Sequence, residues 1–118
     1  MSTTTAPSAV ANPAVKEIEP SAAKDLLARG GCVLVDVREP DEYQIARVAG
    51  VTLLPLSTLP QRFTELDPNQ QIYIHCKAGK RSMKALEFLR QQGFKYLKSV
   101  KGGIDAWSDE IDSSVPKY

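Results

Sequence analysis

Apolar residues fall into short runs and helical spacings that alternate along the chain. Apolar clusters predict strands at residues 15–18, 32–35, 51–54, 71–75 and 96–100. Helix patterns lie at residues 21–29, 40–44, 59–66 and 82–92, and a short helix follows the glycine pair at 102–103. This alternation predicts an α/β fold, a central, mostly parallel sheet of about five strands with helices on both faces.

Length and charge narrow the class of protein. A chain of 118 residues suits one domain, expected over residues 15–118, and the uncharged residues 1–14 are typical of a flexible tail or linker. The formal net charge is only +1, which argues against nucleic acid or an anionic membrane as partner. The N-terminal segment lacks a signal-peptide pattern, and no apolar run is long enough to span a bilayer. The low cysteine content fits a reducing cytoplasm.

The two cysteines lie far apart, and the single histidine cannot join them in a zinc-ligand spacing, so we expect no metal site. Cys32 lies at a strand start and is interpreted as a buried small apolar residue; a role as a resolving thiol is the alternative. His75 precedes Cys76 on a strand, so its side chain points to the opposite face, and a structural role is favoured over a general base. Trp107 is expected in the core.

Cys76 lies where the predicted strand 71–75 meets the next helix. In parallel sheets, chemistry takes place beyond the carboxyl ends of strands, which here are residues 36–39 and 75–82. Free backbone N–H groups at a helix start attract anions, and Gly79 permits a tight or left-handed turn. Residues 68–86 contain no Asp or Glu but have four cations, Lys77, Lys80, Arg81 and Lys84. Both features favour the thiolate form of Cys76, whereas a solvated basic helix start is the structural alternative.

Three segments resemble the signatures of rhodanese-like sulfurtransferases, in the same order. They are the loop from Cys76 to Ser82 (CKAGKRS), residues 35–43 (VDVREPDEY) and residues 101–107 (KGGIDAW). The whole chain is similar to the C-terminal domain of the molybdopterin-synthase adenylyltransferase/sulfurtransferase family. In that family the domain follows an adenylating domain and delivers sulfur to a ubiquitin-like carrier protein. The resemblance therefore implies an N-terminal adenylating domain in a longer natural chain, and a free-standing rhodanese is the alternative.

The resemblance implies a rhodanese-like fold and a catalytic cycle without cofactors. The nucleophile would be Cys76, which takes a sulfane sulfur from a donor such as thiosulfate, or from a persulfide-donor protein, and passes it to an acceptor. The substrate-binding residues would be Lys77, Ala78, Gly79, Lys80, Arg81 and Ser82, with Arg81 and the lysines on the donor's anionic part. Asp36 and Arg38 would support the loop, with a surface ion pair as the plainer reading.

Two other functions remain open at the level of sequence. Cysteine phosphatases, and more remotely arsenate reductases, also end a strand in His-Cys, but they have five residues between Cys and Arg. Only four residues separate Cys76 from Arg81, and the tighter ring favours a single sulfur over a tetrahedral phosphate. A non-catalytic binding module of the same fold is the second alternative, although such modules usually lack the cysteine. Glu39 and Glu42 are interpreted as carboxylates that favour a helix start.

Overall fold

A computed structural model gives the fold, and it describes residues 16–118; the tail expected over residues 1–14 lies outside this range. The strands in the described range are β1 (Glu17–Ile18), β2 (Val33–Asp36), β3 (Thr52–Leu53), β4 (Ile72–His75) and β5 (Leu97–Val100). The helices are α2 (Pro20–Ala28), α3 (Pro40–Ile45), α4 (Leu59–Arg62), α5 (Lys80–Gln91) and α6 (Gly103–Glu110), with 3-10 turns η1 (Leu56–Thr58) and η2 (Phe63–Glu65).

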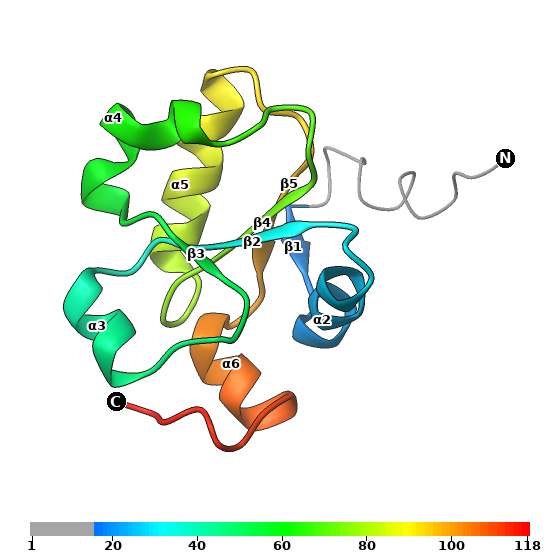
Figure 1. The fold of residues 1–118 in the computed structure, drawn as a ribbon, viewed down its shortest axis with the longest axis vertical. Helices are drawn as coiled ribbons and strands as arrows, with labels where there is room; N and C mark the ends of the chain where they lie inside the picture. The colour runs from blue at the N-terminus through cyan, green and yellow to red at the C-terminus, as the bar shows by residue number, and fades with distance from the viewer. Residues whose placement is uncertain (1–15) are drawn as a thin grey trace, which may run out of the picture.

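The five strands form one sheet in the order β1-β5-β4-β2-β3, and every neighbouring pair is parallel. The predicted α/β class and parallel sheet are therefore confirmed. Figure 1 shows the sheet through the middle of the molecule, with α4 and α5 on one side and α2 and α6 on the other. Because all strands run the same way, their carboxyl ends meet at one edge, and β4 reaches that edge at the centre of the sheet.

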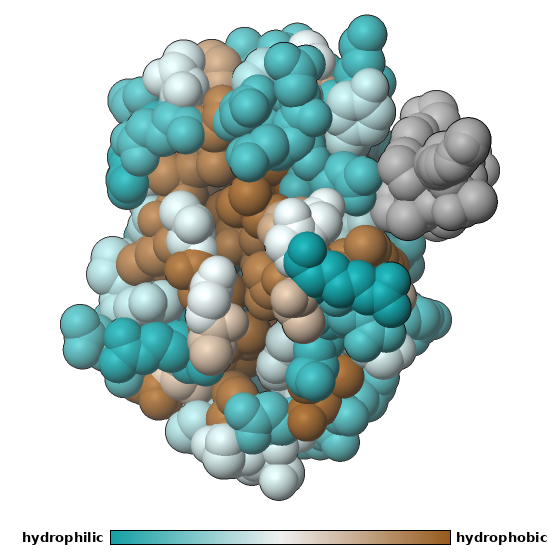
Figure 2. Space-filling view, turned by 45° about the vertical axis from the view of Figure 1, so that its right-hand side comes forward, coloured by the Kyte–Doolittle hydropathy of each residue, from teal (hydrophilic) through white to brown (hydrophobic). Residues whose placement is uncertain are grey.

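The core has two layers because successive strand residues point to opposite faces. Ile72, Ile74 and Cys76 lie in the layer beneath α4 and α5, together with Leu86 and Leu89. Tyr73 lies in the other layer, where Trp107 is only 5% exposed, so the core position expected for Trp107 is confirmed. In Figure 2 apolar side chains are visible as a vertical band between hydrophilic ones, so part of the core reaches this face of the molecule.

Helix α5 and the segment at residues 59–66 differ most from the sequence prediction, and the other elements are shifted by one or two residues at their ends. Helix α5 begins at Lys80, two residues earlier than expected, because Gly79 adopts a left-handed conformation and ends the loop there. The helical spacing near residues 59–66 yields only the short helix α4 and the 3-10 turn η2. None of the helices within residues 16–118 is long and apolar enough to cross a membrane.

Candidate active site

The Cys76 sulfur lies at the carboxyl end of β4 and accepts hydrogen bonds from the chain that follows it. The backbone N–H of Gly79 lies 3.1 Å from Sγ, and that of Ser82 lies 3.3 Å away. The residue is only 1% exposed, so the sulfur is buried although it lies at the edge of the sheet where the sequence predicts the chemistry. The loop of residues 77–82 wraps around the sulfur, which explains both the burial and the hydrogen bonds.

Further backbone donors surround the same loop. The N–H groups of Lys77, Ala78, Lys80 and Arg81 donate to no acceptor within residues 16–118. Gly79 has φ +119°, which a side chain would strain, and this conformation brings its own N–H to the sulfur. A run of backbone N–H groups in a tight loop at a helix start is the arrangement that binds anions.

A pair of buried hydroxyl groups lies behind the sulfur. Ser82 Oγ lies 3.5 Å from Cys76 Sγ, 3.0 Å from the Gly79 carbonyl oxygen and 2.7 Å from Ser99 Oγ on β5. Both serines are 0% exposed. Either hydroxyl can donate in the Ser82–Ser99 hydrogen bond, but Ser82 Oγ also faces the Gly79 carbonyl oxygen, which can only accept, so donation from Ser99 to Ser82 satisfies all three groups. Ser82 can then donate its own hydrogen either to the carbonyl or to a sulfur anion.

The start of α6 fixes the other side of the loop. The N–H groups of Ile104 and Asp105 donate to the carbonyl oxygens of Cys76 (2.8 Å) and Lys77 (3.1 Å). A Cβ at Gly103 would lie 2.4 Å from the Cys76 oxygen, so only glycine allows this approach. The glycine pair noted in the sequence thus has a structural reason in the packing of α6 against the cysteine loop.

Two of the loop's cations are paired with acids from distant segments. Arg81 donates to both carboxylate oxygens of Glu42 on α3, at 2.5 and 2.9 Å, and Lys77 donates to Asp105 on α6 at 3.1 Å. The hydrogen bonds from Arg81 are the main reason that the pKa of Glu42 falls to about 2, against the opposing effect of burial. Sequence reasoning gave Glu42 only a helix-start role, which it also fills by accepting from the Glu39 N–H.

Asp36 and Arg38 form a buried ion pair beside the site. Both side chains are 0% exposed, and Arg38 Nη2 lies 2.7 Å from Asp36 Oδ2. Arg38 also donates to the Ala46 carbonyl oxygen (2.6 Å) and to the Tyr118 hydroxyl (2.8 Å). These contacts tie β2, the end of α3 and the last residue of the sequence together. They rule out a surface ion pair, and they reach the cysteine loop indirectly, through Glu42, His75 and Tyr118.

His75 is buried on the face of the sheet away from the Cys76 sulfur. Its Nδ1 donates to the Cys76 carbonyl oxygen (3.2 Å), because that oxygen can only accept. Nε2 lies 3.8 Å from Asp36 Oδ2 and has no hydrogen-bond partner within the described residues. Burial lowers the pKa of His75, so the ring is neutral. These contacts give it no route to the sulfur as a base, and the orientation expected from strand geometry is observed.

Cys32 lies at the amino end of β2, the edge of the parallel sheet opposite Cys76. Burial raises the pKa of its thiol to about 11, and it packs against the layer that contains Tyr73. The apolar role expected for it fits these surroundings, although it is half-buried and precedes the strand instead of opening it. The topology keeps the two sulfurs apart, which argues against a resolving thiol.

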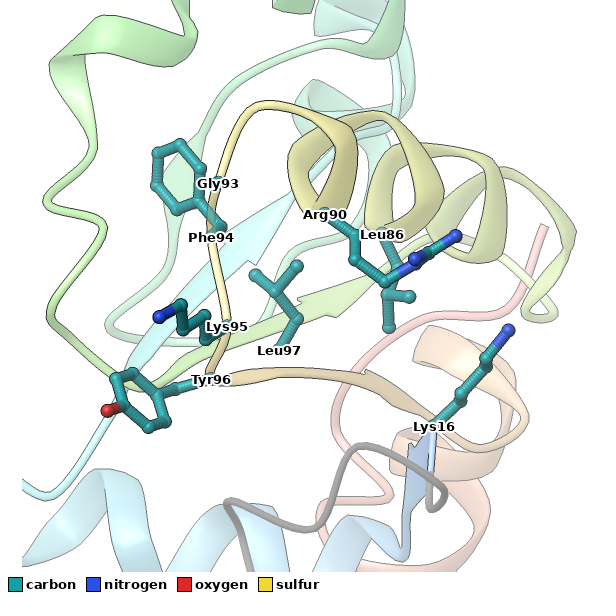
Figure 3. Close-up of a pocket in the computed structure, with 8 residues that line it drawn as sticks. All are labelled: Lys16, Leu86, Arg90, Gly93, Phe94, Lys95, Tyr96 and Leu97. Carbon is teal, nitrogen blue, oxygen red and sulfur yellow. The ribbon is translucent and has the colours of Figure 1, made fainter.

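A pocket of about 440 Å³ also lies away from Cys76. Figure 3 shows that it is lined by α5, the turn after it, the start of β5 and the first described residue, Lys16. It therefore opens toward the amino end of β5 and takes no part in the cysteine site. Among residues 16–118, no three His, Cys, Asp or Glu side chains lie close enough together to hold a metal ion.

The central strand of this parallel sheet ends in a cysteine, and backbone N–H groups at the start of the next helix surround its sulfur. These features define a class of α/β proteins that bind an anionic group in the loop after a central strand. Residues 19–110 match the family model of the rhodanese-like domain, and the chain belongs to that family. The family resemblance seen in the sequence is thereby confirmed.

Known relatives agree with this assignment. The chain is 39% identical over 89 residues to the rhodanese-like/PpiC domain-containing protein 12 of Arabidopsis thaliana, covering 72% of this chain and 30% of that protein. It is 30% identical over 93 residues to the adenylyltransferase and sulfurtransferase MOCS3-2 of Zea mays, covering 73% and 19%. The solved rhodanese-like domain protein of Staphylococcus aureus superposes with a TM-score of 0.75 at 30% identity, covering 88% and 99%. The chain thus spans less than a third of each of these two longer relatives.

Proposed function

We propose that the protein is a sulfurtransferase that carries sulfur as a persulfide on Cys76. The observation that carries this proposal is the pair of hydrogen bonds from the Gly79 and Ser82 N–H groups to Sγ, in a loop with further unpaired donors. Such donors stabilise negative charge on sulfur as an oxyanion hole does on oxygen. The sulfurtransferase in the name of the maize relative supports the same activity.

In the first half of the cycle, the Cys76 thiolate attacks the outer sulfur of the donor. A bond forms between Sγ and that sulfur, and the donor's own sulfur–sulfur bond breaks. With thiosulfate, the electron pair leaves with sulfite and the terminal sulfur keeps one negative charge. The free N–H groups of the loop, at positions 77, 78, 80 and 81, would hold this sulfur, and the Ser82 hydroxyl can turn toward it.

In the second half, an acceptor nucleophile attacks the terminal sulfur and Cys76 leaves as a thiolate, so no cofactor is consumed. We propose a persulfide-donor protein as the natural source of sulfur and a sulfur-carrier protein as its natural acceptor. An adenylating domain in the same pathway would activate that carrier. The adenylyltransferase and sulfurtransferase named among the relatives supports this arrangement.

Intact-mass spectrometry after incubation with thiosulfate tests the proposal. We expect one added sulfur atom that cyanide removes. The Cys76→Ser variant should gain none, whereas Cys32→Ser, the matched control at the opposite edge of the sheet, should load like the parent. No loading by thiosulfate or by a small thiol persulfide would contradict the proposal and favour a binding module. Hydrolysis of a phosphate ester without sulfur loading would favour a phosphatase.

A further inference from the structure

Two of the four cations in and after the cysteine loop, Arg81 and Lys77, are paired with acids. Arg81 points two terminal nitrogens at Glu42, and the side chains are only 33% and 17% exposed. Lys77 is paired with Asp105 in a more open contact, with side chains 36% and 34% exposed. Lys80 and Lys84 are exposed and make no ion pair within residues 16–118. The segment therefore presents backbone donors and two lysines outside these ion pairs, with two carboxylates beside the paired cations.

Glu42 is held in this position from several sides. Its carboxylate accepts hydrogen bonds from the Tyr118 hydroxyl (2.8 Å) and the Glu39 N–H (3.1 Å) as well as from Arg81. Because these bonds lower the pKa of Glu42 to about 2, it stays ionised throughout the neutral range. Its negative charge is therefore a permanent part of the site.

This charge acts differently on donors of different charge. The backbone N–H groups can stabilise one negatively charged sulfur. A second negative group on the donor would have to bind Arg81 or Lys77, which already form ion pairs with acids. A dianion entering the loop is also repelled by the carboxylates behind those cations. A donor that is charged only on its reacting sulfur avoids most of this repulsion.

We propose that Glu42, with a weaker contribution from Asp105, sets the charge specificity of the site. Glu42 is a positioning residue that acts through Arg81. It makes the site favour donors with a single negative charge, such as thiol persulfides and alkyl thiosulfonates, over dianions such as thiosulfate. This inference rests on the proposed sulfurtransferase function and adds the class of donor.

Two donors that differ by one charge allow a direct test. Methanethiosulfonate and thiosulfate each offer an outer sulfur bonded to a sulfonyl sulfur. When Sγ attacks, the sulfur–sulfur bond breaks, and the electron pair leaves with methanesulfinate or with sulfite. The measured quantity is kcat/KM for each donor with cyanide as acceptor, and the readout is the ratio of thiosulfate to methanethiosulfonate. A purely structural defect lowers both values and leaves the ratio unchanged.

We expect the parent protein to use methanethiosulfonate more efficiently than thiosulfate. Glu42→Gln should raise the ratio about fivefold, mainly through a lower KM for thiosulfate, because one negative charge is removed from a partly solvated site. Asp105→Asn should shift it in the same direction by less. The matched control is Glu87→Gln, six residues beyond Arg81 on α5, which breaks exposed ion pairs with Lys16 and Arg90 and should leave the ratio unchanged.

The outcomes separate the two proposals. If both donors load Cys76 and neither Glu42→Gln nor Asp105→Asn changes the ratio, the charge-specificity inference is wrong and the sulfurtransferase function stands. If Glu42→Gln does not fold, Asp105→Asn still decides, because an unchanged ratio in that variant contradicts neutralisation by the acids. If neither donor loads Cys76, the proposed function itself fails.

Discussion

The buried ion pair between Asp36 and Arg38 should be the most sensitive electrostatic contact in the fold. The perturbation is Asp36→Asn, which keeps the shape of the side chain and removes its charge. Arg38 Nε and Nη2 then lose the carboxylate that they contact at 3.0 and 2.7 Å. The guanidinium charge remains, with both side chains shielded from water.

The structure gives the size of the effect. A buried ion that loses its partner costs about 3–5 kcal/mol of folding free energy. Arg38 keeps its hydrogen bonds to the Ala46 carbonyl oxygen and the Tyr118 hydroxyl, which offset part of the cost. We therefore expect Asp36→Asn to lower the free energy of unfolding by about 3 kcal/mol, a large share of the 5–15 kcal/mol typical of a domain.

Urea denaturation followed by tryptophan fluorescence provides the assay, because Trp107 is the only tryptophan and is buried. The double variant Asp36→Asn/Arg38→Met should be at least about 1 kcal/mol more stable than the sum of the two single losses predicts, since no charge is left buried. The matched control is Glu65→Gln, which breaks the exposed pair with Arg62 and should leave the free energy of unfolding almost unchanged.

The reasoning would be refuted if Asp36→Asn cost no more than Glu65→Gln. Strict additivity of the Asp36 and Arg38 substitutions would also refute it, because the two charges would then not depend on each other. Either result would mean that water reaches the pair more readily than its burial indicates.

Other predictions address the loop and its surroundings. Gly103→Ala should lower the free energy of unfolding by more than about 2 kcal/mol through its clash with backbone oxygens, whereas Gly93→Ala, where a Cβ meets nothing within 4 Å, should cost only about 1 kcal/mol for its positive φ. Stability should fall as the pH drops below 6.5, because unfolded His75 binds a proton that its buried native form resists; urea titrations should show a flatter profile for His75→Gln. Ser99→Ala should slow alkylation of Cys76 by iodoacetamide about two- to fivefold, since Ser82 Oγ then loses its hydrogen bond with Ser99 and becomes a weaker donor to the Cys76 thiolate. An unchanged alkylation rate would mean that Ser99 does not strengthen the Ser82 hydroxyl as a donor.

Most of the fold could be predicted from the sequence because its signals are local. The apolar run before Asp36 predicts a strand buried on both faces, and the structure places it between two other strands. Gly79 predicts a sharp turn and indeed has positive φ. Helix α4 was less predictable, because the same apolar spacing fits one turn of α-helix followed by a 3-10 turn. The exact start of α5 also depended on the loop that precedes it.

The candidate site was predictable only in part. Cys76 and the loop after it are contiguous in sequence, so the cradle of N–H groups follows from one strand, one glycine and one helix start. Ser99 could not be predicted, because it comes from another strand and reaches the sulfur through Ser82. Tyr118 likewise gained its role from contacts with residues far away along the chain.

The charges around Cys76 show most clearly what the sequence determined and what only the tertiary structure determined. The sequence by itself determined the parallel α/β fold, the position of the cysteine and the excess of four cations over residues 68–86. Only the tertiary structure decided how many of those cations stay available, because the acids that pair with them, Glu42 and Asp105, come from α3 and α6. The physical reason is the separation along the chain of the residues that interact. A turn or a helix start depends on neighbouring residues, whereas an ion pair depends on which distant side chains the folded chain brings within about 4 Å.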